Sequence, residues 1–508
     1  MPRNTYSKTN TSNIIPAFFL IAYLCIGFIP NWQAVDKIAP QWLCMSILNL
    51  ICLFYLIYLR KQFSERIIHT INTALSYTYI GFISWAALSY FYAINSTEVL
   101  VNITRQLNVL VMYVMMGIFI YDIKQKNRLI SYIISIILIV EVYAVLNEAL
   151  QMINTTGLIV PSELKGVTAN RNITAFSIAI KIPFVLFLIY NFSKVKLKIV
   201  LSGLLFFSIL CLSMIQSRAS FLAMGLAVIM YLSLCIALYL KNKNRSYLYN
   251  FAYLLIPFGL AVFTNQVFLS DKGSDAIARA STITAGVNDD SVNQRLRYYE
   301  DVLTHFSSNP IFGVGLGNWK IKSIDYDAKD ISGYVVPYHA HSDFIQLGAE
   351  LGIIGFLLYL GVFIWATYFV YYIIRFSSAS LEEKVFLFLI LTALAIYSVD
   401  ANLNFPIARP QVLVVWAIII ALINFYYKKN SFSKNNTRNK TLLSYSFLGI
   451  GLITLVPSVY VTNSVYESLK GQMFLLQDFN SNQFNVSINQ VDNIVPDIPN
   501  ISVTTLPL

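Results

Sequence analysis

The stretch from Lys198 to Leu240 reads KIVLSGLLFFSILCLSMIQSRASFLAMGLAVIMYLSLCIALYL. It contains two apolar runs, 198–216 and 219–240, and the short turn between them carries Arg218. A helix needs about 20 mostly apolar residues to cross the hydrocarbon core of a bilayer. Each run therefore predicts one membrane-spanning helix, and together they predict a helical hairpin.

The same pattern recurs along the whole chain of 508 residues. Hydrophobic residues make up 57% and charged residues 12% of it, with a mean hydropathy of +0.62, whereas a soluble domain has about 25% charged residues. This composition excludes an ordinary cytosolic enzyme, a disordered chain and a secreted disulfide scaffold. We predict an all-α, polytopic integral membrane protein with about 12–13 transmembrane helices, at 14–31, 39–59, 72–93, 98–121, 129–149, 173–192, 198–216, 219–240, 247–268, 344–374, 384–401, 411–427 and 441–461.

Two of these runs depart from a simple span. The run at 98–121 is the least apolar because it contains Arg105 and Asn108. The run that starts at 344 is too long for one helix, so we expect its first part to be tilted or re-entrant.

The basic residues predict the orientation. Alternate short loops hold 21 of the 36 Lys and Arg residues and four acidic residues, and cytoplasmic loops are the ones enriched in Lys and Arg. We therefore expect the N-terminus in the cytoplasm and the large loops outside. The net charge of +11 then reflects membrane topology rather than an acidic partner, and nucleic acid is not expected.

We divide the chain into four parts. These are N-terminal transmembrane helices 1–9 (1–268), a large outer loop (269–343), C-terminal transmembrane helices 10–13 (344–461) and an outer tail (462–508). We expect function on the outer face, because the loop there holds three of the four histidines and the opposite loops are short and basic.

The first part of the outer loop that carries candidate chemistry is a predicted helix. Ser291-Val292-Asn293-Gln294 reads as a capping box, and Asn309-Pro310 ends the helix. Apolar residues at helical spacing indicate a stripe that lies against the membrane surface: Val292, Leu296, Tyr299, Leu303 and Phe306. This stripe does not account for Arg295 and Arg297.

Two short segments follow. Gly313-Val314-Gly315-Leu316-Gly317 has no βαβ unit around it, so we expect tight backbone turns and not a dinucleotide site. His339-Ala340-His341 stands where the chain re-enters the membrane. The spacing fixes no third metal ligand, and a neutral imidazole suits removal of a proton from a hydroxyl; a purely structural hydrogen bond is the alternative for each histidine.

Arginines also gather at the outer ends of spans, at Arg218, at Arg171 beside Asn172, and at Arg409. Guanidinium groups bind phosphate through bidentate, charge-assisted hydrogen bonds. Arginines for an anion and a histidine for a hydroxyl, both at the lipid surface, favour group transfer from a lipid-linked diphosphate to an alcohol.

Four segments then carry a family resemblance: RLRYY at 295–299, NPIFGVGLGNW at 309–319, HAHSDFIQL at 339–347 and ELGIIG at 350–355. In this combination the sequence resembles the O-antigen ligase family, including ligase- and polymerase-like proteins. Weaker matches stand at 170–172, 217–219 and 404–406. Ser342 and Tyr299 differ from the family pattern, where we expect Asn and Trp.

The resemblance implies a GT-C-like membrane fold and an inverting glycosyltransferase that needs no metal or other cofactor. Its donor would be a glycan on undecaprenyl diphosphate, used on the periplasmic face of the bacterial inner membrane. Its acceptor would be a hydroxyl of a lipid A core sugar, a protein or another polymer. By position, His341 would be the catalytic base, and Arg295 and Arg218 would hold the diphosphate. Further candidate substrate-binding residues are Arg297, His339, Arg171 and Asn172.

Two other functions stay open at this point. A repeat-unit polymerase for O-antigen or capsule uses similar donors and a similar topology, and the motifs do not separate it from a ligase. A transporter would place paired polar groups in the middle of several spans, whereas most of the polar groups here lie at the outer boundary.

Overall fold

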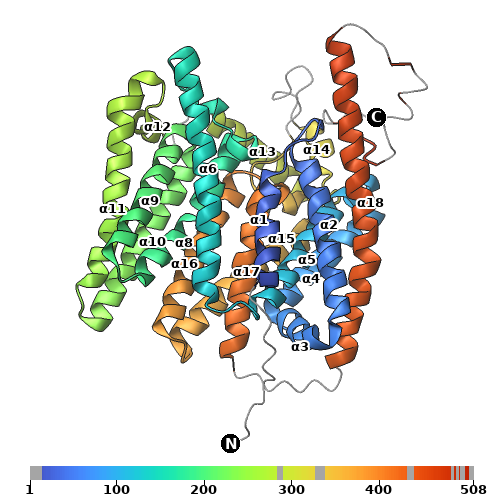
Figure 1. Cartoon of the computed structure of the whole chain (residues 1–508). Coiled ribbons are helices and arrows are strands. Elements are labelled where there is room, and N and C mark those ends of the chain that lie inside the picture. The colour runs from blue at the N-terminus through green and yellow to red at the C-terminus, as the bar shows by residue number, and fades with distance from the viewer. Residues whose placement is uncertain are drawn as a thin grey trace, which may run out of the picture.

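The computed structural model describes residues 14–282, 290–326, 338–431, 440–481, 486–487, 491 and 498–502. Within these ranges the chain forms helices and no β-strand, and eleven helices are long and apolar enough to cross a membrane. They stand side by side as one bundle (Figure 1). The predicted all-α, multi-pass membrane fold is confirmed.

Each predicted span corresponds to a helix or a helix pair. Eleven of the thirteen have the length and hydropathy of a membrane span, and α1 and α4 are shorter, with 12 and 15 residues. The bounds are Ile14–Cys25 (α1), Ile38–Tyr58 (α2), Ala74–Leu88 (α4), Ser96–Ile120 (α5), Lys126–Thr156 (α6), Arg171–Ala179 (α7), Ile182–Asn191 (α8), Val195–Ile215 (α9), Arg218–Asn242 (α10), Ser246–Thr264 (α11), Asp343–Phe376 (α15), Leu381–Leu403 (α16), Pro410–Asn430 (α17) and Lys440–Asn480 (α18).

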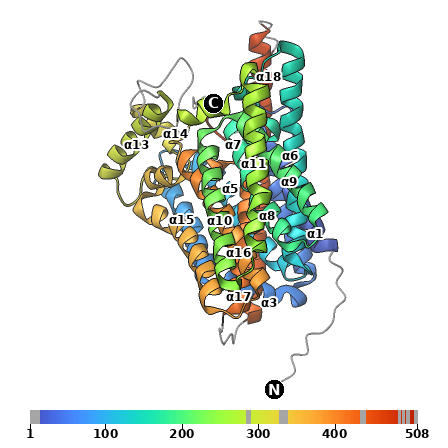
Figure 2. The same cartoon turned by 90° about the vertical axis from the view of Figure 1, so that its left-hand side faces the viewer.

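Four further helices lie at the two ends of the bundle: Arg60–Ile71 (α3), Ala276–Ser281 (α12), Asp290–Ser308 (α13) and Trp319–Lys322 (α14). Helix α3 lies at the lower end in Figure 1, and α12, α13 and α14 lie at the upper end. We call the latter the loop end. Turned by a quarter, Figure 2 shows α13 and α14 projecting beside the start of α15.

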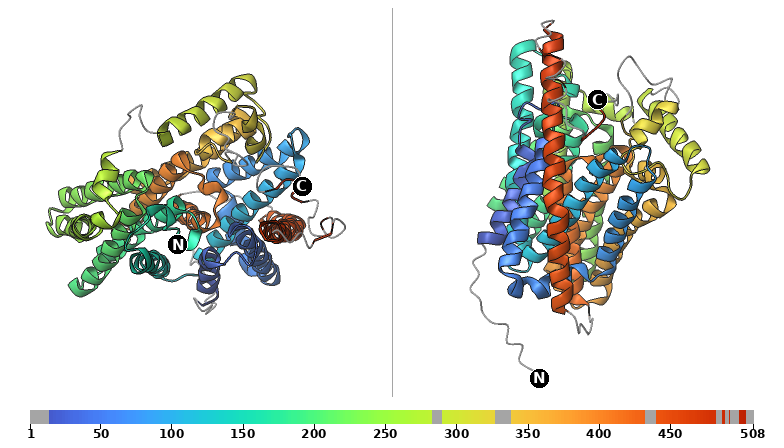
Figure 3. Two further views of the ribbon diagram at one scale, coloured as in Figure 1. Left: turned by 90° about the horizontal axis from the view of Figure 1, so that it is seen from above. Right: turned by 90° about the vertical axis from the view of Figure 1, so that its right-hand side faces the viewer.

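Segments that are distant in the sequence pack together in the bundle. Helix α2 lies against α18, α4 against α15, and α5 against α17. Helix α17 is the most enclosed of these, with 94% of its apolar stretch buried. Figure 3 shows the bundle from above. This arrangement brings the start of α15 and the loop before α17 together at the loop end.

Two helices are longer than predicted. Helix α6 continues past 149 to Thr156, and α18 continues past 461 to Asn480, so the first part of the expected outer tail is helical. Apolar residues at helical spacing continue the pattern beyond the span, because Val461, Val465 and Leu469 are buried against Ala34 and Val101. No proline or glycine pair interrupts this part of the helix.

The long helix α15 is broken at Gly352, which has φ 65° and ψ −168°. A side chain at Gly352 would place its Cβ 2.0 Å from the carbonyl oxygen of Ile311. The groups freed by the break bond elsewhere: Trp85 Nε1 donates to the Leu351 carbonyl at 2.9 Å, and Ile353 N donates to the Pro310 carbonyl at 2.8 Å. The expectation of a separate first part of this span is confirmed.

A buried ion pair fixes the junction between α7 and α8. Lys181 Nζ lies 2.8 Å from Glu141 Oε2 on α6 and 2.7 Å from the Ser177 carbonyl oxygen, and the Lys181 side chain is 1% exposed. An unpaired charge at this depth would be costly. The pair therefore ties α6 to the α7–α8 junction.

Candidate active site

The histidine loop, residues 338–342, runs into the first turn of α15. Ser342 is the N-cap of that helix, and its Oγ accepts a hydrogen bond from Ile345 N at 3.4 Å. Serine and asparagine are comparable N-cap residues. Serine in place of the asparagine of the family pattern therefore leaves this cap intact.

His341 is held between α13 and the loop before α17. Its ring stacks on Tyr298 with centroids 6.1 Å apart, and it meets the edge of Phe405 at 5.4 Å. The Tyr299 hydroxyl lies 3.2 Å from the His341 carbonyl oxygen and 3.0 Å from the Asn402 carbonyl oxygen. The Tyr299 hydroxyl thus contacts carbonyl oxygens of both the histidine loop and α16, and it links these two elements.

The His341 imidazole is neutral near pH 7. Burial, together with the positive charge of Arg295 on α13, lowers the pKa of His341 to about 4. Its Nδ1 is buried and accepts or donates no hydrogen bond within the described residues. The ring is therefore positioned by packing, and its buried Nδ1 has no hydrogen-bond partner among the described residues.

His339 has a different neighbourhood. It stacks on the face of Phe405 at 4.2 Å, and burial with the charge of Arg409 lowers the pKa of His339 to about 3. Phe405 therefore contacts both histidines, one on its face and one at its edge.

The loop between α16 and α17 holds Phe405 in this place. Asp343 Oδ2, at the start of α15, accepts a hydrogen bond from Ile407 N at 3.0 Å. The Arg409 guanidinium lies over the Phe405 ring at 5.1 Å. These contacts connect the beginnings of α15 and α17 and fix the ring that the two histidines share.

The glycine-rich loop, residues 313–317, is hydrogen-bonded to the first part of α15, which follows the histidine loop. Gly313, Gly315 and Gly317 have φ values of 70°, 97° and 76°, which favour glycine. Glu350 accepts hydrogen bonds from Gly315 N at its carbonyl and from Gly317 N at its carboxylate, both at 2.8 Å. The prediction of tight backbone turns is confirmed.

Helix α13 forms as predicted, but its buried face differs from the predicted stripe. Tyr298, Val302 and His305 are buried at 5% exposure or less, whereas Leu296 and Leu303 are exposed. The buried face packs against α15, and the exposed leucines face outward from the bundle. The side chains of the predicted capping box begin at Ser291, which lies outside the residues with described side chains.

The remaining predicted site residues are spread over the loop end. Arg218 is the first residue of α10, and its Nε donates to Thr282 Oγ1 at 3.1 Å. Arg297 is exposed on α13. Arg171 and Asn172 begin α7, where Asn170 caps the helix, and no described hydrogen bond joins their side chains to the histidine loop. Of the predicted site residues, the structure brings Arg295, His339 and His341 within electrostatic reach: Arg295 acts on His341, and His341 acts on His339.

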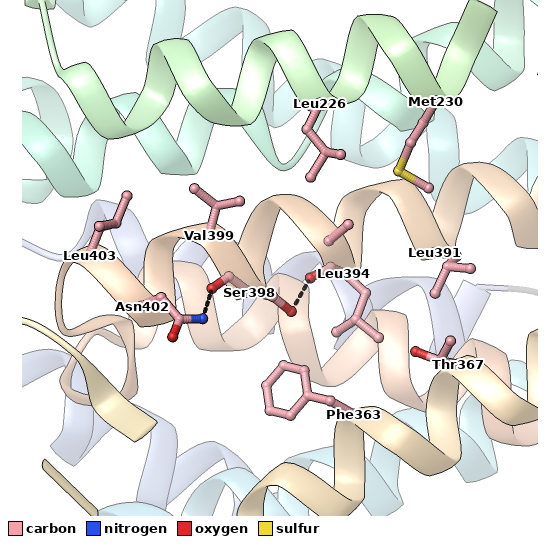
Figure 4. Close-up of a pocket in the computed structure, with 11 residues that line it drawn as sticks. Leu226, Met230, Phe363, Thr367, Leu391, Leu394, Ser398, Val399, Asn402 and Leu403 are labelled. Atoms are coloured by element: carbon pink, nitrogen blue, oxygen red, sulfur yellow. Dashed lines mark hydrogen bonds between the residues drawn. The ribbon is translucent and has the colours of Figure 1, made fainter. Parts of the chain in front are cut away.

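An apolar groove descends from this region between α10, α15 and α16 (Figure 4). It has a volume of about 620 Å³, and its lining includes Leu226, Met230, Phe363, Leu394 and Val399. At its upper end lies Asn402, whose carbonyl oxygen also contacts Tyr299. The groove thus leads from the apolar flank of the bundle to the residues around His341.

A second cavity, of about 410 Å³, lies on the side of His339; it is lined by apolar and charged side chains, and we call it the polar cavity because of its charged residues. Its charged lining residues are Asp36, Glu98, Arg105, Lys320 and Arg409. They come from separate parts of the chain, so their meeting could not be read from the sequence. The available signal was Arg105 inside an otherwise apolar run.

These features define a multi-pass membrane protein in which a paired-histidine loop, nearby arginines and an apolar groove meet at one end of a helical bundle. Residues 203–360 match the family model of the O-antigen ligases, and this stretch contains Arg218, Arg295, His339 and His341. The predicted resemblance is confirmed over this segment, which supports an O-antigen ligase-type membrane glycosyltransferase. No curated protein matches the chain in sequence.

Proposed function

We propose that this protein transfers a preassembled glycan from undecaprenyl diphosphate to a hydroxyl acceptor on the periplasmic face of the bacterial inner membrane. The observation that carries the proposal is the environment of His341. A neutral imidazole whose buried Nδ1 has no described hydrogen-bond partner interacts with the charge of Arg295, and Tyr299 links it to Asn402 at the upper end of an apolar groove. Transfer from such a donor requires a base, a cation that binds the diphosphate, and an apolar groove for the polyprenyl chain.

The donor fits the groove in one direction. Its polyprenyl chain takes the apolar walls of α10, α15 and α16, and its diphosphate lies at the upper end of the groove. Arg218 begins α10 and Arg295 stands on α13, so both can approach the phosphates. Bidentate contacts from two guanidinium groups would stabilise the charge that develops on the leaving diphosphate.

The transfer is a single displacement. The acceptor oxygen forms a bond to the anomeric carbon, and the bond from that carbon to the phosphate oxygen breaks. The acceptor proton goes to His341, and undecaprenyl diphosphate leaves with the bonding electrons. One displacement inverts the anomeric configuration, and the arginines take the part that a divalent metal would otherwise have.

Donor binding also explains how a base with so low a pKa can act. The diphosphate charge beside Arg295 would offset one of the two causes that lower the pKa of His341. The imidazole then becomes a stronger base in the donor complex than in the free protein. Proton removal is thereby coupled to the presence of the donor.

Deletion of the gene in the source bacterium, with complementation by variants, tests this proposal. His341→Ala and Arg295→Ala should fail to restore the modified surface product, whereas Glu300→Gln, an exposed change on the same helix α13, should restore it. The product that is lost identifies the acceptor class: long-chain lipopolysaccharide or glycoprotein. Persistence of single attached repeat units would instead indicate a polymerase. Full complementation by His341→Ala, at equal protein level, would overturn its role as the base.

A further inference from the structure

The polar cavity beside His339 is lined mostly by elements that do not line the apolar groove. Its walls come from the start of α2, from α5, α14 and α18, from the histidine loop with the first part of α15, from the loop that carries Arg409, and from the segment 498–502. The apolar groove, by contrast, is formed by α10, α15 and α16. The two spaces share no lining residue, yet Phe405, which lines the polar cavity, touches both histidines.

The charges in this cavity are unevenly paired. Lys320 forms an ion pair with Glu98 at 2.7 Å, and the Asp36 carboxylate accepts hydrogen bonds from the backbone at the start of α2. Arg105 forms no hydrogen bond or ion pair within the described residues, and Arg409 Nε is buried with no hydrogen-bond partner there. Two guanidinium groups therefore face one shared space with donors left over.

Arg105 also acts on Arg409. Burial and the charge of Arg105 lower the pKa of Arg409, while Asp36 acts in the opposite direction. Burying two like charges near one another is unfavourable unless an anion lies between them. Three cations and two carboxylates line the cavity, so it has one positive charge in excess.

We infer that this cavity binds the acceptor, and that Arg105 and Arg409 hold an anionic group on it, a carboxylate or a phosphate. This inference rests on the proposed function, because it assigns the second substrate of that same transfer. The acceptor is then a sugar or glycan that carries a negative charge near its reactive hydroxyl. The donor and the acceptor reach the histidine loop from different sides of Phe405.

The segment 498–502 forms part of the wall of this site. Asn95 Nδ2 donates to Asn500 Oδ1 at 2.9 Å, the Tyr338 hydroxyl donates to the Ser502 carbonyl at 3.4 Å, and Ile501 is 7% exposed. A segment that follows the last membrane span thus forms part of the wall of the polar cavity. Acceptor recognition in this protein therefore involves residues outside the segment 203–360 that matches the family.

Titration of the full-length protein in nanodiscs with three related sugars tests the inference. Glucuronate carries a carboxylate, glucose 6-phosphate carries a phosphate, and glucose carries neither. At least one anionic sugar should bind about tenfold or more tightly than glucose, since charge-assisted hydrogen bonds are worth that much. Arg105→Gln should remove this preference. Arg105→Lys keeps the positive charge but lacks the planar guanidinium that binds an oxyanion through two hydrogen bonds, so it should reduce the preference severalfold.

Arg218→Gln is the matched control, because Arg218 is assigned to the donor diphosphate. It should leave the preference for anionic sugars in place. The inference is overturned if glucose binds as tightly as both anionic sugars, if Arg105→Gln keeps the preference, or if Arg218→Gln alone removes it. The titration requires no glycan transfer, so its failure is distinct from a failure of the complementation experiment, which tests the transferase itself.

Discussion

His341 is held with φ 56°, in the left-handed region that costs a non-glycine residue free energy. Contacts on both sides hold it there: the Ser342 N-cap follows it, and the Tyr299 hydroxyl contacts its carbonyl oxygen. The conformation lets the ring stack on Tyr298 while Phe405 meets its edge. Backbone strain is thus accepted at the residue assigned as the base.

The pH dependence of turnover should report this residue. A base acts in its neutral form, and burial with the Arg295 charge lowers the pKa of His341 from 6.5 to about 4. Donor kcat/KM should therefore rise as the pH rises through about 4 and stay level through neutral pH. Arg295→Gln should move the acid limb of its residual activity to higher pH. Release of undecaprenyl diphosphate measures both, and a wild-type limb near 6.5 would contradict the lowered pKa of His341.

The Tyr299 hydroxyl gives a second prediction at this scale. Tyr299→Phe removes the contacts to His341 and Asn402 while keeping the ring, so the histidine loop loses one constraint. We expect kcat to fall by roughly tenfold, with donor KM nearly unchanged. Tyr77→Phe is the control, because that hydroxyl bonds to Asn72 at the opposite end of the bundle. Equal kcat values for Tyr299→Phe and wild type would show that the hydroxyl does not position the loop.

At the scale of elements, the break in α15 sets the direction of the histidine loop. The first part, which begins at Asp343, lies across the loop end, and the second part crosses the membrane beside α4. The glycine-rich loop docks on the break through Val314 N and Gly315 N, which donate to the carbonyl oxygens of Ala349 and Glu350. The break thus joins the span to the loop that the family pattern marks.

Replacing Gly352 should disrupt this junction. Gly352→Ala would place a Cβ 2.0 Å from the Ile311 carbonyl oxygen at a φ of 65°, so the free energy of unfolding should fall by more than about 1 kcal/mol. Gly449→Ala, in α18, meets nothing within 4 Å and should be neutral or stabilising by about 0.5–1 kcal/mol. Thermal unfolding in detergent compares the two variants. An unchanged midpoint for Gly352→Ala would mean that the break can move.

At the scale of the whole molecule, hydropathy predicted the spans because each one is a local property of about 20 residues. The histidine loop and Arg295 were predicted from motifs that lie in one continuous segment of the sequence. The polar cavity was not, because Arg105, Lys320 and Arg409 meet only after α5, α14 and α17 pack. The continuation of α18 to Asn480 was also missed, as its buried residues are partners of Ala34 and Val101 and not of lipid.

The orientation of the bundle remains a prediction, and it decides whether the site faces the periplasm. Helix α3, the start of α6 and the ends of α10 and α17 carry the excess of Lys and Arg, and they share the lower end in Figure 1. Because positive loops stay in the cytoplasm, the loop end with His341 should face outward.

Cysteine labelling tests this orientation directly. In a variant without the five native cysteines, which are all free, Asp271→Cys and Lys241→Cys place single exposed thiols at the loop end and at the opposite end. A membrane-impermeant maleimide should label Asp271→Cys in intact spheroplasts, and Lys241→Cys only after permeabilisation. The reverse pattern would place the histidine loop in the cytoplasm, where a periplasmic transfer could not occur, and would remove the basis of the proposed function even if every contact around His341 were correct.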